Sequence, residues 1–256
     1  MKKITSSVYT FENLIENQIL YIDKTEYIWN LVASAPAMYF LSRPRRFGKS
    51  LTVSTLKAVF QGKKELFKGL AIYDKPYDWK QYPVIHLDMN GLDFSSVEEL
   101  ESSLCDLVTE AAASHELTLE SANAASMFRA LINQLAEQEQ VVILVDEYDK
   151  PILNNLGKPQ AQKILDKLKV FYSVIKAFES KERFVFVTGV SKFCHVSLFS
   201  DLNNLTDISM HRDYATMFGY TQGEFETYFA DRIDTACKQL NMSREELLPE
   251  IKAWYD

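Results

Sequence analysis

Residues 38–50 read Met38-Tyr39-Phe40-Leu41-Ser42-Arg43-Pro44-Arg45-Arg46-Phe47-Gly48-Lys49-Ser50, a short apolar run followed at once by a basic loop. A loop that joins a strand to a helix can surround phosphate oxygens with successive backbone N–H groups and with the positive end of the helix. Gly48 lets the backbone approach closely, Lys49 reaches the terminal phosphates, and Ser50 offers a hydroxyl to Mg²⁺. We therefore predict an ATP-binding loop, or Walker A element, formed by Arg43, Pro44, Arg45, Arg46, Phe47, Gly48, Lys49, Ser50 and Leu51.

The loop departs from the general pattern G-x-x-x-x-G-K-[ST], because Arg43 stands where that pattern has its first glycine. A Gly-Lys-Ser tripeptide alone is weak evidence, so the prediction depends on a second element. The stretch Val141-Val142-Ile143-Leu144-Val145-Asp146-Glu147 is an apolar strand that ends in two adjacent carboxylates. In nucleoside triphosphate hydrolysis, Asp146 would bind Mg²⁺ and Glu147 would polarise the attacking water. The alternative is a buried strand that simply ends in solvent among charged residues.

Thr188 follows another predicted strand, where a polar residue can sense the γ-phosphate or orient water. It can equally be a threonine that completes a strand before a glycine turn. We expect the loop and the acid pair to converge on a single metal–triphosphate pocket. Its expected catalytic residues are Lys49, Asp146, Glu147 and Thr188, and its expected Mg²⁺ ligands are Ser50 and Asp146.

The pattern of apolar runs predicts an α/β fold with three layers and a mainly parallel five-stranded sheet, as in P-loop NTPases. The expected strands are Met38–Leu41, Pro83–Leu87, Val141–Val145, Phe184–Val187 and Thr206–Met210. The middle three are apolar on both faces, which is typical of buried parallel strands. The expected helices are Lys49–Phe60, Val97–Ala113, Ala125–Glu137 and Gln160–Glu179, the second of them opened by a capping box of Ser95 and Glu98.

The strand–helix alternation stops near residue 212. Thr221 with Glu224, and Ser243 with Glu246, open two further helices without a strand between them. We therefore predict a nucleotide-binding core over residues 1–212 and a small helical lid or linker over residues 213–256.

Two further groups of residues are candidates for contacts with the nucleotide. Asp23, with Lys24 and Tyr27, precedes the first strand and could contact the adenine or the ribose; the alternative is that Asp23 caps a helix. Arg43, Arg45 and Arg46 could neutralise phosphate charge, or could instead point outward to acids such as Asp149. Arg212 is a further candidate arginine finger, acting within the chain or from a neighbouring subunit of a homo-oligomer.

Composition excludes several classes of protein. The 256 residues carry a net charge of −7, which disfavours a surface built to bind nucleic acid, and we expect no direct nucleic-acid partner. The three cysteines are scattered, which is typical of reduced thiols in a cytoplasmic protein. No apolar run approaches the length of a membrane span, so we expect a soluble protein without a membrane partner.

The sequence resembles the bacterial AAA-ATPase-like family of P-loop ATPases, which is related to the AAA and STAND groups. The residues that carry the resemblance are Tyr21–Thr25, Arg43–Leu51, Asp146–Pro151, Thr188–Lys192, Leu202–Leu205 and Phe218–Thr221. Loops of the type Arg-Pro-Arg-Arg-Phe-Gly-Lys-Ser recur in that family, so Arg43 does not depart from this group. The resemblance implies an ATPase core, often followed by a C-terminal domain similar to PD-(D/E)XK nucleases. The sequence stops at Asp256, before any such domain, which is a possible partner of this core.

Two functions remain open at this point. The first is an ATP hydrolase whose turnover with Mg²⁺ drives or gates an attached effector domain, and the pair Asp146-Glu147 favours it. The second is a nucleotide-gated switch that binds ATP or ADP and has negligible turnover. A small-molecule kinase is a third, less favoured class, because such enzymes rarely place a glutamate beside the metal-binding aspartate at the end of the strand.

Overall fold

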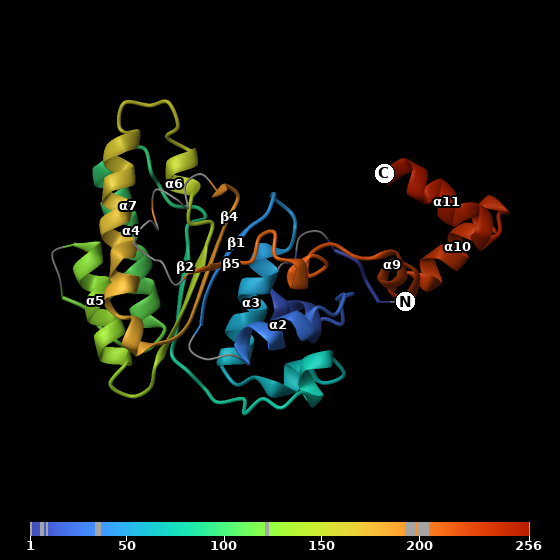
Figure 1. Ribbon diagram of the computed structural model, residues 1–256, viewed down its shortest axis with the longest axis horizontal. Helices are drawn as coiled ribbons and strands as arrows, with labels where there is room; N and C mark the ends of the chain where they lie inside the picture. Colours follow the sequence, from blue (N-terminus) through green and yellow to red (C-terminus); the bar gives the residue numbers. More distant parts are fainter. Residues whose placement is uncertain are drawn as a thin grey trace.

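A parallel sheet of five strands forms the centre of the protein in the computed structural model, which describes residues 2–5, 8, 10–33, 37–120, 123–192, 198 and 205–255. The strand order is β2-β3-β4-β1-β5, and every neighbouring pair is parallel. Figure 1 shows the sheet between two groups of helices. The strands are β1 (Ala37–Ser42), β2 (Val84–Asp88), β3 (Val141–Asp146), β4 (Glu182–Gly189) and β5 (Thr206–Asp207).

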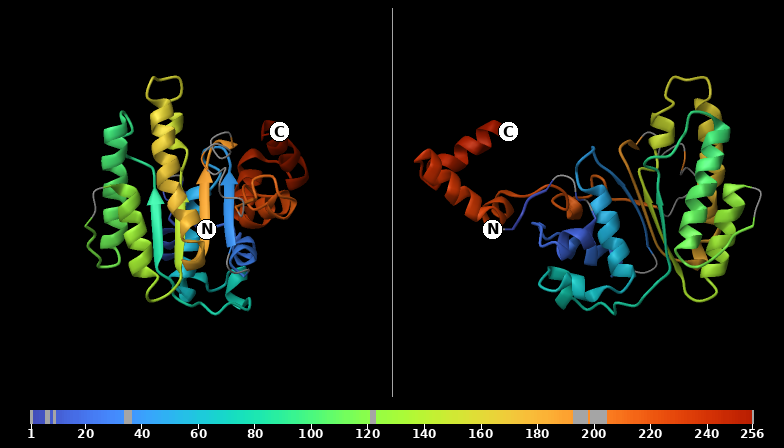
Figure 2. Two further views of the ribbon diagram at one scale, coloured as in Figure 1. Left: turned by 60° about the vertical axis from the view of Figure 1, so that its left-hand side comes forward. Right: turned by 180° about the vertical axis from the view of Figure 1, so that it is seen from behind.

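The helices cover both faces of the sheet, as the alternation of strands and helices predicts. Figure 2 shows the two layers from other directions. One layer consists of α4 (Val97–Ala113), α5 (Ala124–Leu135) and α7 (Ala161–Ala177). The other consists of α1 (Phe11–Glu16), α2 (Thr25–Val32) and α3 (Lys49–Phe60), with the short 3₁₀ turns η1 (Lys64–Phe67) and η2 (Ala71–Asp74). The three-layer α/β fold predicted from the sequence is therefore confirmed.

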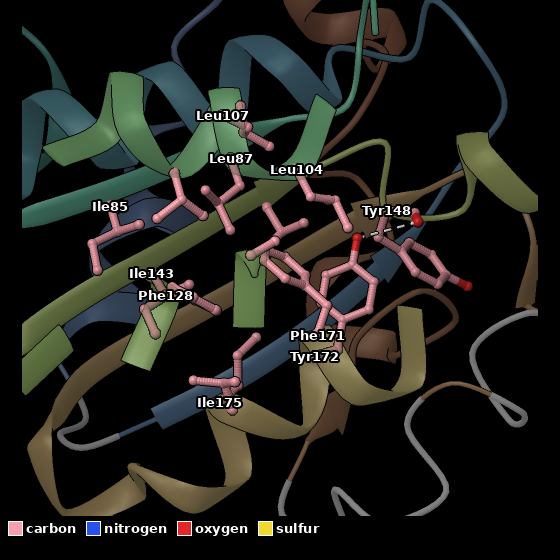
Figure 3. Close-up of a cluster of buried hydrophobic side chains, with 14 of the residues drawn as sticks. Ile85, Leu87, Leu104, Leu107, Phe128, Ile143, Tyr148, Phe171, Tyr172 and Ile175 are labelled. Carbon is pink, nitrogen blue, oxygen red and sulfur yellow. Dashed lines mark hydrogen bonds between the residues drawn. The ribbon is translucent and has the colours of Figure 1, made fainter. Parts of the chain in front are cut away.

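The apolar side chains of each strand point alternately into two cores, one on either face of the sheet, because successive residues of a strand face opposite sides. In β3, Ile143 faces the core below α4, α5 and α7, whereas Leu144 faces the core below α3. Figure 3 shows part of the first core, where Ile143 and Phe128 lie close to the rings of Phe171 and Tyr172. Every residue of β3 and β4 is buried, which fits the uninterrupted apolar runs in their sequences.

Three local predictions need correction. The last predicted strand stops at Asp207, because the Asp207 carboxylate accepts the N–H of Ser209 at 2.8 Å and turns the chain. The helix α4 is capped by Ser96, whose hydroxyl accepts the N–H of Glu99 at 3.1 Å, and not by Ser95. The strand β2, which we expected to be buried on both faces, lies at the edge of the sheet, and two of its residues, His86 and Asp88, are only partly buried.

The C-terminal residues form three helices, α9 (Gln222–Tyr228), α10 (Ala230–Leu240) and α11 (Arg244–Tyr255), preceded by the short turn η4 (Arg212–Tyr214). Figure 1 shows them beyond α2 and α3, on the side away from the sheet. The capping box of Thr221 and Glu224 opens α9 as predicted. Several contacts tie this segment to the start of α2. Among them, the Lys24 ammonium lies 2.6 Å from the Glu224 carboxylate, and the Tyr228 hydroxyl accepts the N–H of Asp23 at 3.2 Å.

The remaining elements are α6 (Lys150–Leu153), directly after the acid pair, and η3 (Glu179–Lys181), directly before β4. Among the described helices, none combines the length and the apolar character that crossing a membrane requires. The family motif around Leu202, Asn203 and Asn204 lies outside the described residues.

Candidate functional site

The backbone donors of the loop between β1 and α3 are a feature of the site. Within the described residues, the N–H groups of residues 45–50 donate to no other protein group. Gly48 caps α3 with φ 84°, a left-handed conformation that glycine adopts without strain, and Arg46 also has a positive φ of 68°. The loop therefore presents successive free amide donors at the N-terminus of a 12-residue helix.

Lys49 is buried within this loop, with 5% of its surface exposed. Its ammonium donates to the backbone carbonyls of Arg43 at 2.9 Å and Pro44 at 3.0 Å, which leaves one of its three N–H donors for a ligand. Burial lowers the pKa of Lys49, while the nearby carboxylates of Asp146 and Glu147 act in the opposite direction. A phosphate group would supply the negative charge that this ammonium meets at present only from carboxylates.

The two adjacent acids at the end of β3 lie in different environments. Asp146 is buried, and its Oδ1 accepts the hydroxyl of Thr188 and the N–H of Glu147, the latter at 3.0 Å. Within the described residues, no hydrogen bond reaches Oδ2 of Asp146. Glu147 has a positive φ of 54°, and 21% of its side chain is exposed. The carboxylate of Glu147 lies 3.5 Å from the ammonium of Lys150, which also donates to Asn90 after β2 at 2.5 Å.

One cavity of about 580 Å³ is lined by both elements, although they are 100 residues apart in the sequence. Gly48, Lys49 and Ser50 line it from the loop, and Glu147 lines it from the end of β3. Arg45 and Arg46 contribute to the same lining. The parallel strands β1 and β3 make this possible, because both end at the same edge of the sheet.

A second cavity of about 480 Å³ continues from the first, since Arg46, Gly48 and Leu51 line both. Its other walls are largely apolar and come from several parts of the chain, including Leu14 of α1 and Thr52 and Thr55 of α3. Tyr21 and Lys24 contribute from the segment before α2, and residues 217–220 contribute from the segment before α9.

The structure separates the three residues that we expected at the base or the ribose. Lys24 lines the second cavity, but Asp23 and Tyr27 do not. The carboxylate of Asp23 accepts the N–H of Thr25 at 2.8 Å and the N–H of Ala71 at 2.7 Å. The N-cap of α2 is Lys24, so the alternative that Asp23 caps the helix is not confirmed either. The hydroxyl of Tyr27 lies 2.6 Å from that of Thr216. A role for Asp23 at the nucleotide stays a prediction.

The arginines of the loop do not pair with Asp149. The carboxylate of Asp149 is fully buried and accepts the N–H groups of Val190 and Ser191. Arg43 lies over the ring of Phe218 at 5.8 Å, next to the second cavity. Arg212 is exposed at the start of η4 and lines neither cavity.

The site suits Mg²⁺ only if a phosphate ligand supplies part of the coordination of the ion. Among the described residues, no group of three or more His, Cys, Asp or Glu side chains could hold a metal ion alone. Mg²⁺ is commonly bound through one or two protein oxygens together with substrate phosphates and water. The hydroxyl of Ser50, which lines the cavity, suits this role, and so does the Oδ2 atom of Asp146. Asp146 and Thr188 are buried behind the cavity lining and are not part of it.

Sequence reasoning missed three parts of the site. The hydrogen bonds from Val190 and Ser191 to Asp149 join residues 41 and 42 positions apart, and the contact between Lys150 and Asn90 spans 60 positions. The aromatic wall at Phe218 belongs to a segment that we expected only as a lid. The signal that could have found all three was the family motifs Asp146–Pro151, Thr188–Lys192 and Phe218–Thr221, in which only Asp146, Glu147 and Thr188 had been given roles.

Comparison with known proteins agrees with this arrangement. The sequence model of the AAA-ATPase-like family, described as "Predicted AAA-ATPase", matches residues 6–199. A relative from Azotobacter chroococcum mcd 1, described as "Uncharacterized protein in vnfD 5'region", is 39% identical over 260 residues. That match covers 100% of this chain and 48% of the relative, so the chain spans about half the length of the relative.

Proposed function

Because the chain belongs to the predicted AAA-ATPase family, we propose that it binds ATP with Mg²⁺ in the cavity between the phosphate loop and Glu147, and hydrolyses it. The observation that carries this proposal is that two elements line the same cavity. They are the phosphate loop, with its free amide donors, and Glu147, whose carboxylate is partly exposed. The first suits a polyphosphate, and the second suits the activation of a water molecule.

Each residue has a role that follows from its position. The amides of residues 45–50 and the ammonium of Lys49 would bind phosphate oxygens. Asp146 and Ser50 would hold Mg²⁺, which when bound neutralises charge on the phosphates. The bond from Thr188 holds Oδ1 of Asp146, so Oδ2 is the oxygen that would be left for the metal ion. Glu147 would accept the proton of the attacking water, and Lys150 limits where its carboxylate can lie.

The second cavity is the proposed site of the nucleobase. It is joined to the phosphate cavity at Gly48, and its lining includes the aromatic side chains of Tyr21, Phe218 and Tyr220. Aromatic rings can stack on a base, and the ammonium of Lys24 adds a polar group at the same wall. The expected adenine contact therefore moves from Asp23 and Tyr27 to these residues.

Calorimetric titration with ATP, with and without Mg²⁺, tests the proposal on the wild type, Lys49→Ala and Glu147→Gln. Lys49→Ala should bind ATP at least about tenfold more weakly, because a charge-assisted contact to phosphate is lost. Glu147→Gln should bind ATP normally, while its phosphate release falls by about 10²-fold or more. Lys163→Ala, on the exposed surface of α7, is the matched control and should change neither quantity. Unchanged ATP binding by Lys49→Ala would refute the assignment of the loop.

A nucleotide-gated switch is the second candidate function, and one observation favours it. The segment before α9 supplies Phe218, Gly219 and Tyr220 to the cavity, so a ligand there touches both the core and the helical segment. Tight binding of ATP with no phosphate release from the wild type would select this function. A further domain driven or gated in this way is part of the same proposal, which the greater length of the relative motivates.

A further inference from the structure

The loop that follows β4 is fastened to the residues that follow β3 by contacts outside the proposed reaction. The carboxylate of Asp149 accepts the N–H of Ser191 at 2.6 Å and the N–H of Val190 at 3.0 Å. Tyr148 adds two bonds: its N–H donates to the carbonyl of Thr188 at 3.0 Å, and its hydroxyl donates to the carbonyl of Ser191 at 2.6 Å. We call these contacts of Tyr148 and Asp149 with residues 188–191 the loop clamp.

The loop clamp leaves no free space at its centre. A Cβ atom added to Gly189 would lie 2.3 Å from Cε1 of Tyr148 and 2.7 Å from Oδ1 of Asp149, both far inside contact distance. Asp149 and Tyr148 are fully buried, so water cannot easily replace a lost acceptor. The ring of Tyr148 also packs edge-on against Phe40 of β1. The backbone carbonyl of Tyr148 accepts the hydroxyl of Tyr172, as Figure 3 shows.

The first of the clamped residues, Thr188, still belongs to β4, and its hydroxyl donates to Oδ1 of Asp146. Oδ1 also accepts the N–H of Glu147, so the two bonds together hold the carboxylate and leave Oδ2 for another ligand. A shift of the loop would move Thr188, remove one of these two bonds and let the carboxylate of Asp146 rotate. The route from Asp149 to Asp146 thus runs through the backbone of residues 189–191 and the side chain of Thr188.

We propose that Asp149 is a positioning residue of the phosphate site: through the loop clamp it fixes Thr188, and through Thr188 it fixes the carboxylate of Asp146 against the metal–phosphate group. This inference rests on the proposed function, because it assigns a role to Asp149 in that same reaction. Asp149 itself does not touch the nucleotide. Its contribution is the geometry of Thr188 and Asp146.

A double-mutant cycle on ATP hydrolysis tests the inference, with Asp149→Ala, Thr188→Val and the two together. Asp149→Ala should lower kcat by about 10²-fold, the usual effect of a misplacement of about 1 Å. Binding of ATP, measured without turnover, should change by less than about threefold, since the loop amides and Lys49 are untouched. In the background of Thr188→Val, Asp149→Ala should produce no further loss, because the group through which it acts is already absent.

Two variants keep the test decisive if Asp149→Ala does not fold. Asp149→Asn retains one acceptor oxygen and should recover part of kcat. Tyr148→Phe removes only the bond to the carbonyl of Ser191 and should lower kcat less than Asp149→Ala. Asp93→Ala is the matched control, because Asp93 also accepts a loop N–H, that of Ser95 at 2.8 Å, but in the loop after β2. It should leave kcat unchanged.

The outcomes separate this inference from the function on which it rests. A wild type without turnover refutes the hydrolytic function and this inference together. A wild type that hydrolyses ATP, with independent and multiplicative losses from Asp149→Ala and Thr188→Val, refutes the positioning role alone. A parallel loss of ATP binding and kcat in Asp149→Ala, with a lowered Tm, also refutes it, because general destabilisation then explains the effect.

Discussion

Glu182 places a carboxyl group inside the protein at the start of β4, where 1% of its surface is exposed. Neither carboxyl oxygen has a hydrogen-bond partner among the described residues. Burial, with a smaller contribution from the charge of Glu179, raises the pKa of Glu182 from its ordinary 4.5 to about 8. We predict that Glu182→Gln stabilises the protein at alkaline pH and that this gain disappears in acid.

The sign follows from proton linkage. Below pH 4.5 both the folded and the unfolded chain hold the proton, so this carboxyl group does not make the free energy of unfolding depend on pH. As the pH rises toward 8, the unfolded chain releases the proton while the folded protein retains it, and the free energy of unfolding falls. The difference between 4.5 and about 8 corresponds to a loss of at most about 5 kcal/mol, which is complete above the folded pKa.

Urea unfolding at pH 6.0 and pH 8.5 measures the effect, both values lying above the pI of about 5.3. The advantage of Glu182→Gln over the wild type should be larger at the higher pH by about 3 kcal/mol. Glu65→Gln, at an exposed position in η1, removes the same charge and should show no such change between the two values of pH. An advantage of Glu182→Gln that is equal at both values, within about 0.5 kcal/mol, would refute the reasoning.

Three further predictions concern the site and the helical segment. Gly189→Ala should lower the free energy of unfolding by about 1–3 kcal/mol in a urea titration, because its Cβ meets the ring of Tyr148 at 2.3 Å; no change would mean that the clamped loop is loose. Lys24→Met removes the ion pair with Glu224 and should speed tryptic cleavage within residues 213–256, while global stability changes by less than about 1 kcal/mol. Equal cleavage rates would contradict that attachment. Phe218→Ala should weaken ATP binding in calorimetry by about tenfold but leave binding of inorganic triphosphate unchanged, since only the base cavity loses a wall. An equal loss for both ligands would contradict the division into base and phosphate cavities.

Local sequence determined the elements of the site, because each of them is built from consecutive residues. The phosphate loop follows β1 and opens α3, and α3 begins at Lys49 and ends at Phe60 as predicted. The strand β3 consists of five aliphatic residues and ends at Asp146, which is the first residue of the acid pair. Periodicity and a glycine before a lysine suffice for such features, since they depend on contacts between near neighbours in the chain.

Tertiary structure decided which of these elements meet and what the remaining residues do. The order of the strands places β4 between β3 and β1, and no local pattern specifies such an order. The sequence shows Asp149 only as one more charge after a strand, whereas the fold buries it against the amides of Val190 and Ser191. The aromatic wall at Phe218 reaches the phosphate loop because the C-terminal segment packs back on α2. Neighbouring residues in the sequence determine whether a strand, a cap or a loop forms. The partner of a buried charge depends on how the whole chain folds, because that partner lies far away in the sequence.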